Sequence, residues 1–110
     1  MRVSLVCQIK TDQNTHYKIQ VGDPELLVGG EKTKPMNSNW ILKSGWTGYV
    51  NPGTLTYAPV LYLKVPSDTA KSTVSVQVKV INLDDSSDTG STHDMVFDLI
   101  PVNFFQTTLC

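Results

Sequence analysis

The sequence predicts an all-β domain whose antiparallel sheet is built from hairpins. Apolar and polar residues alternate with a period of two over residues 2–10 and again over residues 73–83. In the second segment β-branched valines occupy every other position, which favours a strand over a helix. No window carries a helical period. With 110 residues the chain can bury one hydrophobic core but not two, so a single domain over residues 1–110 is expected.

The first two strands are expected over residues 2–10 and 17–21, as a hairpin around a polar turn. Successive side chains of a strand point to opposite faces, so one face of this ribbon is apolar. The other face carries Arg2, Ser4, Gln8, Lys10, Lys18 and Gln20. Such a flat, basic, hydrogen-bonding face suits RNA phosphates and bases. The alternative is the ordinary polar solvent face of an antiparallel sheet.

The remaining elements alternate between turn-rich connections and extended segments. In chain order they are a break at 22–24, a short apolar piece at 25–28, a polar loop at 29–39, short strands at 40–42 and 46–50, a turn at 51–53, strands at 54–65 and 73–83, a polar loop at 84–94 and an extended stretch at 95–105 interrupted by Pro101. Pro59 cannot donate to a ladder, so its strand is expected at a sheet edge or to contain a bulge.

Charge is segregated along the chain. All nine lysines and arginines lie in residues 1–79, and residues 80–110 hold five acids and no base. The formal net charge of −1 excludes global electrostatic steering toward nucleic acid, so only a local basic surface could bind it. A solvated surface that happens to segregate its charges is the alternative.

The N-terminal segment does not resemble a signal peptide, because residues 1–9 alternate instead of forming a continuous apolar run. No segment has the length of a membrane span. The cytosol is therefore expected, where Cys7 and Cys110 stay reduced. If a leader has been removed, a bridge between the first strand and the C-terminus becomes available. The two cysteines leave both alternatives open.

Catalytic chemistry has little support in the sequence. His16 lies in the first turn and His93 in the acidic loop, with no third ligand at metal spacing. Cys7 falls on the apolar side of its strand, as a small buried hydrophobe would. The aspartates of the loop at 84–94 match no calcium motif. Since nucleophile-elbow, phosphate-loop and zinc-protease motifs are also missing, we expect no enzyme, metal or cofactor.

A set of short motifs occurs in an order seen in a viral family. The motifs are Arg2-Val3-Ser4, Tyr17-Lys18-Ile19-Gln20-Val21, Pro24, Val28-Gly29-Gly30, Pro35, Trp40 and Leu61-Tyr62-Leu63-Lys64-Val65-Pro66. Together they resemble the coat proteins of single-stranded RNA bacteriophages, the levivirus type. The resemblance departs from the family in two places. The family's N-terminal hairpin is missing, and so are its C-terminal helices, because residues 73–105 are expected to form strands.

The resemblance implies a homodimer with one continuous antiparallel sheet, assembled into an icosahedral shell around single-stranded RNA. It places the RNA-binding residues on one face of that sheet: Arg2, Ser4, Gln8, Lys18, Gln20, Tyr62 and Lys64. The basic residues would bind phosphates, and Tyr62 would stack on an unpaired base. The expected location is the virion, assembled in the host cytoplasm, with neither a cofactor nor a membrane partner. Loops 29–39 and 45–53 are expected to contact neighbouring dimers.

Two other functions stay open. Gly53-Thr54-Leu55 and residues 72–80 and 97–101 are similar to the closing strands of jelly-roll capsid proteins, which would make the chain a fragment of such a fold. The chain could instead be a secreted β-sandwich adhesion or pilin-like domain with a disulfide between its ends. Particles that contain RNA favour a coat protein, whereas an oxidised Cys7–Cys110 pair in a monomer favours the secreted sandwich.

Overall fold

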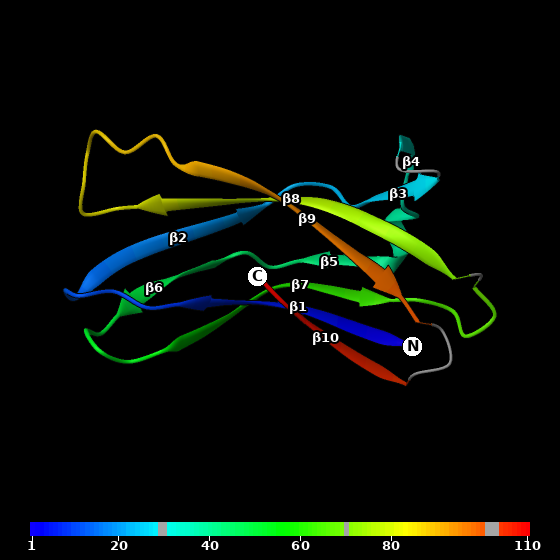
Figure 1. Ribbon diagram of the computed structural model, residues 1–110, viewed down its shortest axis with the longest axis horizontal. Helices are drawn as coiled ribbons and strands as arrows, with labels where there is room; N and C mark the ends of the chain where they lie inside the picture. The colour runs from blue at the N-terminus through cyan, green and yellow to red at the C-terminus, as the bar shows by residue number, and fades with distance from the viewer. Residues whose placement is uncertain (29–30, 70, 101–103) are drawn as a thin grey trace.

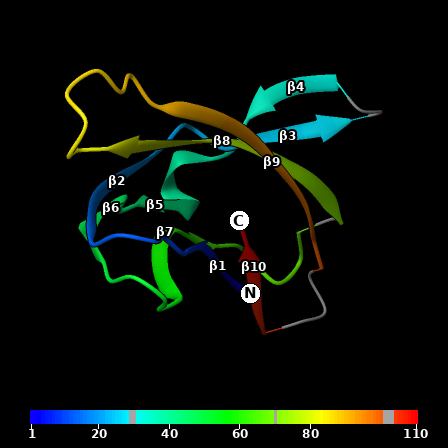
Figure 2. The ribbon, with the colours of Figure 1, turned by 60° about the vertical axis from the view of Figure 1, so that its left-hand side comes forward.

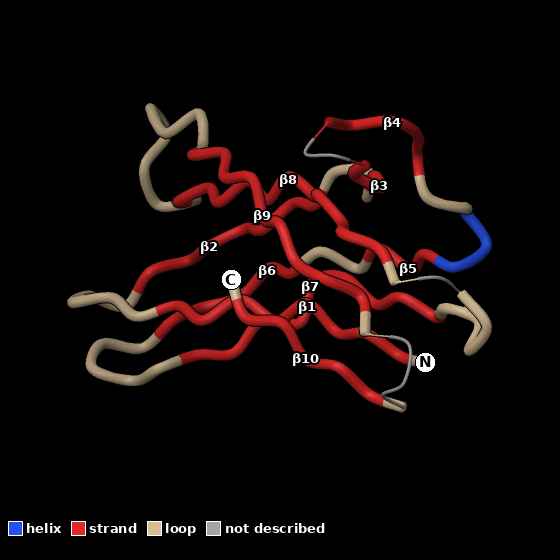
Figure 3. Tube along the Cα trace, turned by 45° about the vertical axis from the view of Figure 1, so that its right-hand side comes forward, coloured by secondary structure: helices blue, strands red, loops and turns tan. Residues whose placement is uncertain are grey.

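The computed structural model describes residues 1–28, 31–69, 71–100 and 104–110. Nearly all regular structure in this part of the chain is extended, with one short 3₁₀ turn, η1 (Ser38–Trp40), before β5 (Figures 1 and 3). The strands are β1 (Arg2–Ile9), β2 (Thr15–Val21), β3 (Glu25–Val28), β4 (Glu31–Pro35), β5 (Ile41–Lys43), β6 (Trp46–Val50), β7 (Thr56–Lys64), β8 (Ser72–Asn82), β9 (Ser91–Leu99) and β10 (Phe105–Leu109). No helix among these residues is long and apolar enough to cross a membrane.

The strands form two sheets that lie over one another as a sandwich (Figure 2). Sheet A has the order β10-β1-β7-β5, and sheet B has the order β4-β3-β8-β2-β6, with β9 on the other edge of β8. The strand pairs are antiparallel except for β1 and β10, which run parallel, among the residues that are described. The all-β, antiparallel prediction is therefore confirmed.

The predicted N-terminal hairpin is wrong, although its two strands are correctly placed. β1 lies in sheet A between β7 and β10, whereas β2 lies in sheet B between β6 and β8. Leu5 of β1 and Ile19 of β2 are both 1% exposed and belong to the same buried cluster. A hairpin would place the two apolar rows side by side on one face. The sandwich buries both of them by turning the rows toward the interior from two layers.

The core lies between the two sheets and contains the inward-facing residues of their central strands. It is made mainly of Val3, Leu5, Ala58, Val60, Leu61, Leu63, Val74, Val76, Val78, Phe97 and Leu99. Fully burying one Val or Leu side chain contributes about 1.5–3 kcal/mol. The alternation in β1 and β8 therefore does more than define strands, because it decides which side of each sheet faces the solvent.

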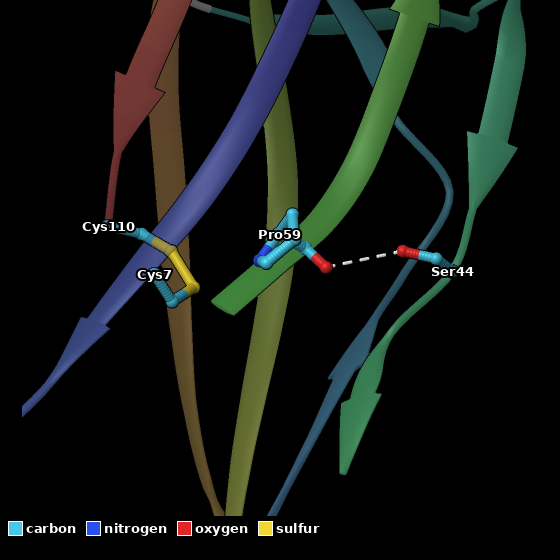
Figure 4. Close-up of a disulfide and its surroundings, with 4 residues drawn as sticks. All are labelled: Cys7, Ser44, Pro59 and Cys110. Atoms are coloured by element: carbon cyan, nitrogen blue, oxygen red, sulfur yellow. Dashed lines mark hydrogen bonds between the residues drawn. A yellow bond between two sulfur atoms is a disulfide. The ribbon is translucent and has the colours of Figure 1, made fainter. Parts of the chain in front are cut away.

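The bulge predicted as one of two alternatives at Pro59 is present, in a strand that lies between β1 and β5. The register of β1 against β7 shifts between Leu5 and Val6, the latter opposite Pro59. The Ser44 hydroxyl donates to the Pro59 carbonyl oxygen at 3.3 Å (Figure 4). Gly45, which follows Ser44, has a φ of 59° and directs the chain out of sheet A into β6 of sheet B.

Three segments expected to be loop or unassigned are strands. The polar loop predicted at 29–39 contains β4 and η1, β9 begins at Ser91 instead of residue 95, and β10 extends to Leu109. Each of these segments is a strand because it pairs with a neighbour that is distant or separated by a turn: β4 pairs with β3, β9 with β8, and β10 with β1. Gly29, Gly30 and Pro101 lie outside the described residues.

A disulfide joins Cys7 to Cys110, with the two Cα atoms 4.5 Å apart (Figure 4). The parallel ladder of β1 and β10 continues into this pair, since the Cys110 amide donates to the Val6 carbonyl and the Gln8 amide to the Cys110 carbonyl. The Gln106 side-chain amide donates to the Asp98 carbonyl at 2.6 Å, which ties β10 to the end of β9. The two cysteines, left open by the sequence, thus fasten the last strand to the first.

Removing this disulfide should lower the free energy of unfolding. The cross-link closes a loop with a sequence separation of 103 residues, and loss of a native disulfide costs about 2–5 kcal/mol in small domains. We expect the double variant Cys7→Ser/Cys110→Ser to unfold at lower urea concentration than the oxidised protein. Identical urea midpoints for oxidised protein and double variant would contradict this expectation.

Candidate nucleic-acid interface

The seven predicted RNA-binding residues divide between the outer faces of the two sheets. On sheet A, Arg2 pairs with Lys64 and Ser4 pairs with Tyr62 across β1 and β7, and Gln8 lies further along β1 on the same face. On sheet B, Lys18 and Gln20 are both exposed on β2. The outer faces of the two layers point in opposite directions (Figure 2). One flat ligand surface therefore cannot contain all seven residues.

The outer face of sheet A combines these polar residues with exposed large apolar side chains. Leu42 lies beside Tyr62, Phe105 beside Arg2, Leu109 beside Val6 and Tyr57 beside Gln8. Their exposed fractions are 63% for Leu42, 71% for Phe105, 51% for Leu109 and 57% for Tyr57. These exposed side chains make the outer face of sheet A a candidate interaction surface.

The outer face of sheet B contains a polar hollow of about 540 Å³ around Lys18 and Gln20. We call it the lysine hollow and define it by Lys18, Lys43 and Lys79. Gln20 pairs with Lys79 of β8, and Lys18 pairs with Thr47 of β6. Residues from the β5–β6 turn and from β6, β8 and β9 also line it, among them Ser44, Gly45, Trp46, Gln77 and Thr92.

Among the residues that the structure describes, one of the three lysines has a carboxylate partner. Lys43 Nζ lies 2.5 Å from Asp23 Oδ1, with the two side chains 42% and 77% exposed, and exposed pairs of this kind contribute little to stability. Lys18 and Lys79 form no ion pair with any residue that the structure describes. The hollow therefore offers two uncompensated positive charges to an anion.

Sequence reasoning found Lys18 and Gln20 but missed Lys43 and Lys79. Lys79 alternates with the valines of β8, so its position on an outer face could be read from the sequence. The position of Lys79 beside Gln20 depends on the pairing of β2 with β8, because the two residues lie opposite one another in that ladder. The position of Lys43 in the hollow depends on the bend at Gly45, which brings the end of β5 beside sheet B. No sequence signal identifies either neighbour.

The acidic loop after β8 uses its carboxylates to hold its own backbone. Asp88 accepts hydrogen bonds from the amides of Asn82 and Gly90, at 2.7 and 2.8 Å. Hydrogen bonds from the Ser87 hydroxyl and amide hold the pKa of Asp85 below its usual value. Among the described residues, no group of three or more His, Cys, Asp or Glu side chains is arranged to bind a metal ion.

The His16 and Tyr49 rings stack beside this loop, with centroids 4.3 Å apart and an interplanar angle of 12°. The backbone amide of His16 donates to Asp84 at 2.9 Å. The ring stacking and this hydrogen bond account for the position of His16 near the start of β2.

Comparison of the chain with protein-family models, with curated proteins and with solved structures found no match in any of the three.

The Arg2–Lys64 pair gives a direct test of the sheet A register. Like charges directly opposite one another in an antiparallel pair destabilise it, and opposite charges contribute about 0.2–1 kcal/mol. We therefore expect Lys64→Glu to raise the urea midpoint of unfolding. Lys71→Glu makes the same charge change at an exposed site before β8 and serves as the control. A Lys64→Glu midpoint at or below that of Lys71→Glu would refute the proposed pairing energy.

Proposed function

We propose that the protein is a non-enzymatic coat subunit that assembles with copies of itself and binds single-stranded RNA through the lysine hollow. The observation that carries the proposal is the concentration of Lys18, Lys43 and Lys79 in one open hollow, two of them without an ion-pair partner among the described residues. The motif order described above supports the same function. In this proposal the subunit acts in a virion assembled in the host cytoplasm.

The chemistry of the lysine hollow suits a single strand better than a duplex. Lysines bind phosphates as flexible point charges, and this term supplies most of the sequence-independent affinity. Gln20, Gln77 and Thr92 provide hydrogen-bonding groups for bases or ribose hydroxyls in the same hollow. Arg2, Gln8 and the other predicted residues of sheet A could meet only a second stretch of RNA on the opposite face.

Self-assembly is proposed through sheet A. Its outer face exposes Leu42, Tyr57, Phe105 and Leu109, which a second subunit would remove from water. Strands β5 and β10 form the edges of this sheet and carry unpaired backbone groups. The continuous sheet across a homodimer, predicted from the sequence, would use one of these edges.

A secreted β-sandwich adhesion or pilin-like domain is the second candidate, favoured by the Cys7–Cys110 disulfide and the two-layer fold. Disulfides form and persist in oxidising compartments and are rare in the cytosol. A stable monomer that keeps the oxidised pair and retains no RNA would support this candidate. Assembled, RNA-containing particles would support the coat subunit.

Lys18→Glu should weaken RNA binding while leaving the fold intact. Lys18 is exposed on the outer face of β2, and the adjacent Ile19 is 1% exposed in the core, so the substitution leaves the apolar face unchanged. Loss of one phosphate contact should flatten the log–log salt dependence of binding by about one unit. Filter binding of unstructured RNA at several salt concentrations measures both effects.

Lys71→Glu is the matched control, because it makes the same charge change at an exposed site outside the hollow and outside the predicted RNA-binding face. Thr15 is unsuitable for this purpose, since it is 7% exposed and its hydroxyl donates to the Gln13 carbonyl at 2.7 Å. If Lys18→Glu binds RNA as well as Lys71→Glu does, the lysine hollow is only a solvated surface and the proposal fails.

Leu42→Lys should impair assembly without unfolding the subunit. Leu42 is 63% exposed, so the free subunit tolerates a charge there, whereas a subunit interface over sheet A does not. Size-exclusion chromatography with light scattering should show multimers for the wild type and smaller species for the variant. Leu83→Lys, at a loop position that is 42% exposed, is the control. A wild type that stays monomeric at micromolar concentration would rule out the assembly proposal.

A further inference from the structure

Arg2 and Lys64 form a like-charge pair at one end of sheet A. They lie directly opposite one another in the antiparallel ladder of β1 and β7, and both are exposed on the outer face. Directly opposed like charges destabilise an antiparallel pair of strands. Neither side chain forms an ion pair within the part of the chain that is described. A bound anion between the two side chains would relieve this repulsion, and none of the described residues places a carboxylate there.

The same two residues line a hollow of about 400 Å³ that is separate from the lysine hollow. Its remaining wall consists of Met1, Asn39, Trp40, Val65, Pro66 and Ser67. This volume lies near the lower end of the range for small-molecule sites.

Trp40 lines the same hollow as the two cations. It immediately precedes Ile41, which pairs with Leu63, so Trp40 lies level with Lys64 on the side of β7 away from Arg2. Its indole is partly buried against the core, which holds the ring in place before any ligand arrives. The exposed side chains of Asn39 and Ser67 add hydrogen-bonding groups to the same wall.

The geometry points to a binding site for a nucleoside monophosphate. Arg2 and Lys64 hold the phosphate, and Trp40 stacks on the base. Arginine can bind two phosphate oxygens at once, and lysine adds a point charge. Base stacking on an aromatic side chain tolerates any base, so the site selects for a phosphorylated nucleoside without strong sequence preference. This site goes beyond the proposed RNA binding, since it lies on the other sheet and shares no lining residue with the lysine hollow.

Isothermal titration calorimetry with four probes tests the assignment: adenosine monophosphate, ribose 5-phosphate, adenosine and inorganic phosphate. The phosphate and the base each contribute, so adenosine monophosphate should bind at least about tenfold more tightly than ribose 5-phosphate or adenosine. Equal affinity for adenosine monophosphate and ribose 5-phosphate would overturn the stacking role of Trp40. Equal affinity for adenosine monophosphate and adenosine would overturn the role of the two cations.

Variants separate the two halves of the site. Lys64→Gln should weaken adenosine monophosphate and ribose 5-phosphate alike, by about tenfold, because it removes a charged contact to phosphate. Trp40→Leu should weaken only the nucleotide, and Trp40→Phe should restore most of its affinity. If Lys64→Gln leaves the affinity for adenosine monophosphate unchanged, the proposal is overturned, whether or not Trp40→Leu folds.

Lys18→Gln is the control, since Lys18 lines the lysine hollow on the opposite sheet. It should leave nucleotide affinity unchanged while weakening RNA binding. Nucleotide binding lost in Lys18→Gln would overturn the separate site on sheet A. The RNA result of the same variant bears only on the coat proposal, so the failure of either idea is distinguishable from the failure of the other.

Discussion

The buried cluster shared by the two sheets is the constraint on which the rest of the molecule depends. Val3 and Leu5 from one layer and Val74 and Val76 from the other belong to one buried cluster, each at most 1% exposed. Because side chains alternate along a strand, burying these rows turns every intervening polar residue outward. Two polar outer faces on opposite sides of the domain are therefore a direct consequence of one shared core.

Strand positions could be predicted from the sequence because alternation is a local property, but strand partners could not. The polar residues between β1 and β2 suit a hairpin turn and a passage between layers equally well. The burial of Leu5 and Ile19 decides between these two arrangements, because the sandwich buries both side chains. The bulge at Pro59 could be foreseen, since a missing amide is also a local property. β4, the start of β9 and β10 are polar or short, and tertiary pairing makes them strands.

The candidate sites show the same division. Outward-facing residues such as Lys18, Tyr62 and Lys64 follow from alternation alone, so each could be named from the sequence. Which of these residues lie together on one surface could not be predicted from the sequence. Lys18 and Lys64 lie on different sheets, and Lys18 instead joins Lys79 in the hollow through pairing between strands distant in sequence. A pattern of residue types identifies candidates for binding, and long-range register decides which of them share a ligand.

The position of the disulfide also determines how the domain responds to tension. Cys7 and Cys110 are joined covalently where the first and last strands meet. A force applied between residues 1 and 110 passes along the first seven residues and directly across the sulfur–sulfur bond. Residues 8–109, which contain most of the core and the lysine hollow, lie off that covalent path, so the force reaches them only through the ladders that hold residues 2–6 against β7 and β10. While the bond is intact, tension can extend no more than the first seven residues, and reduction would open the whole chain to it.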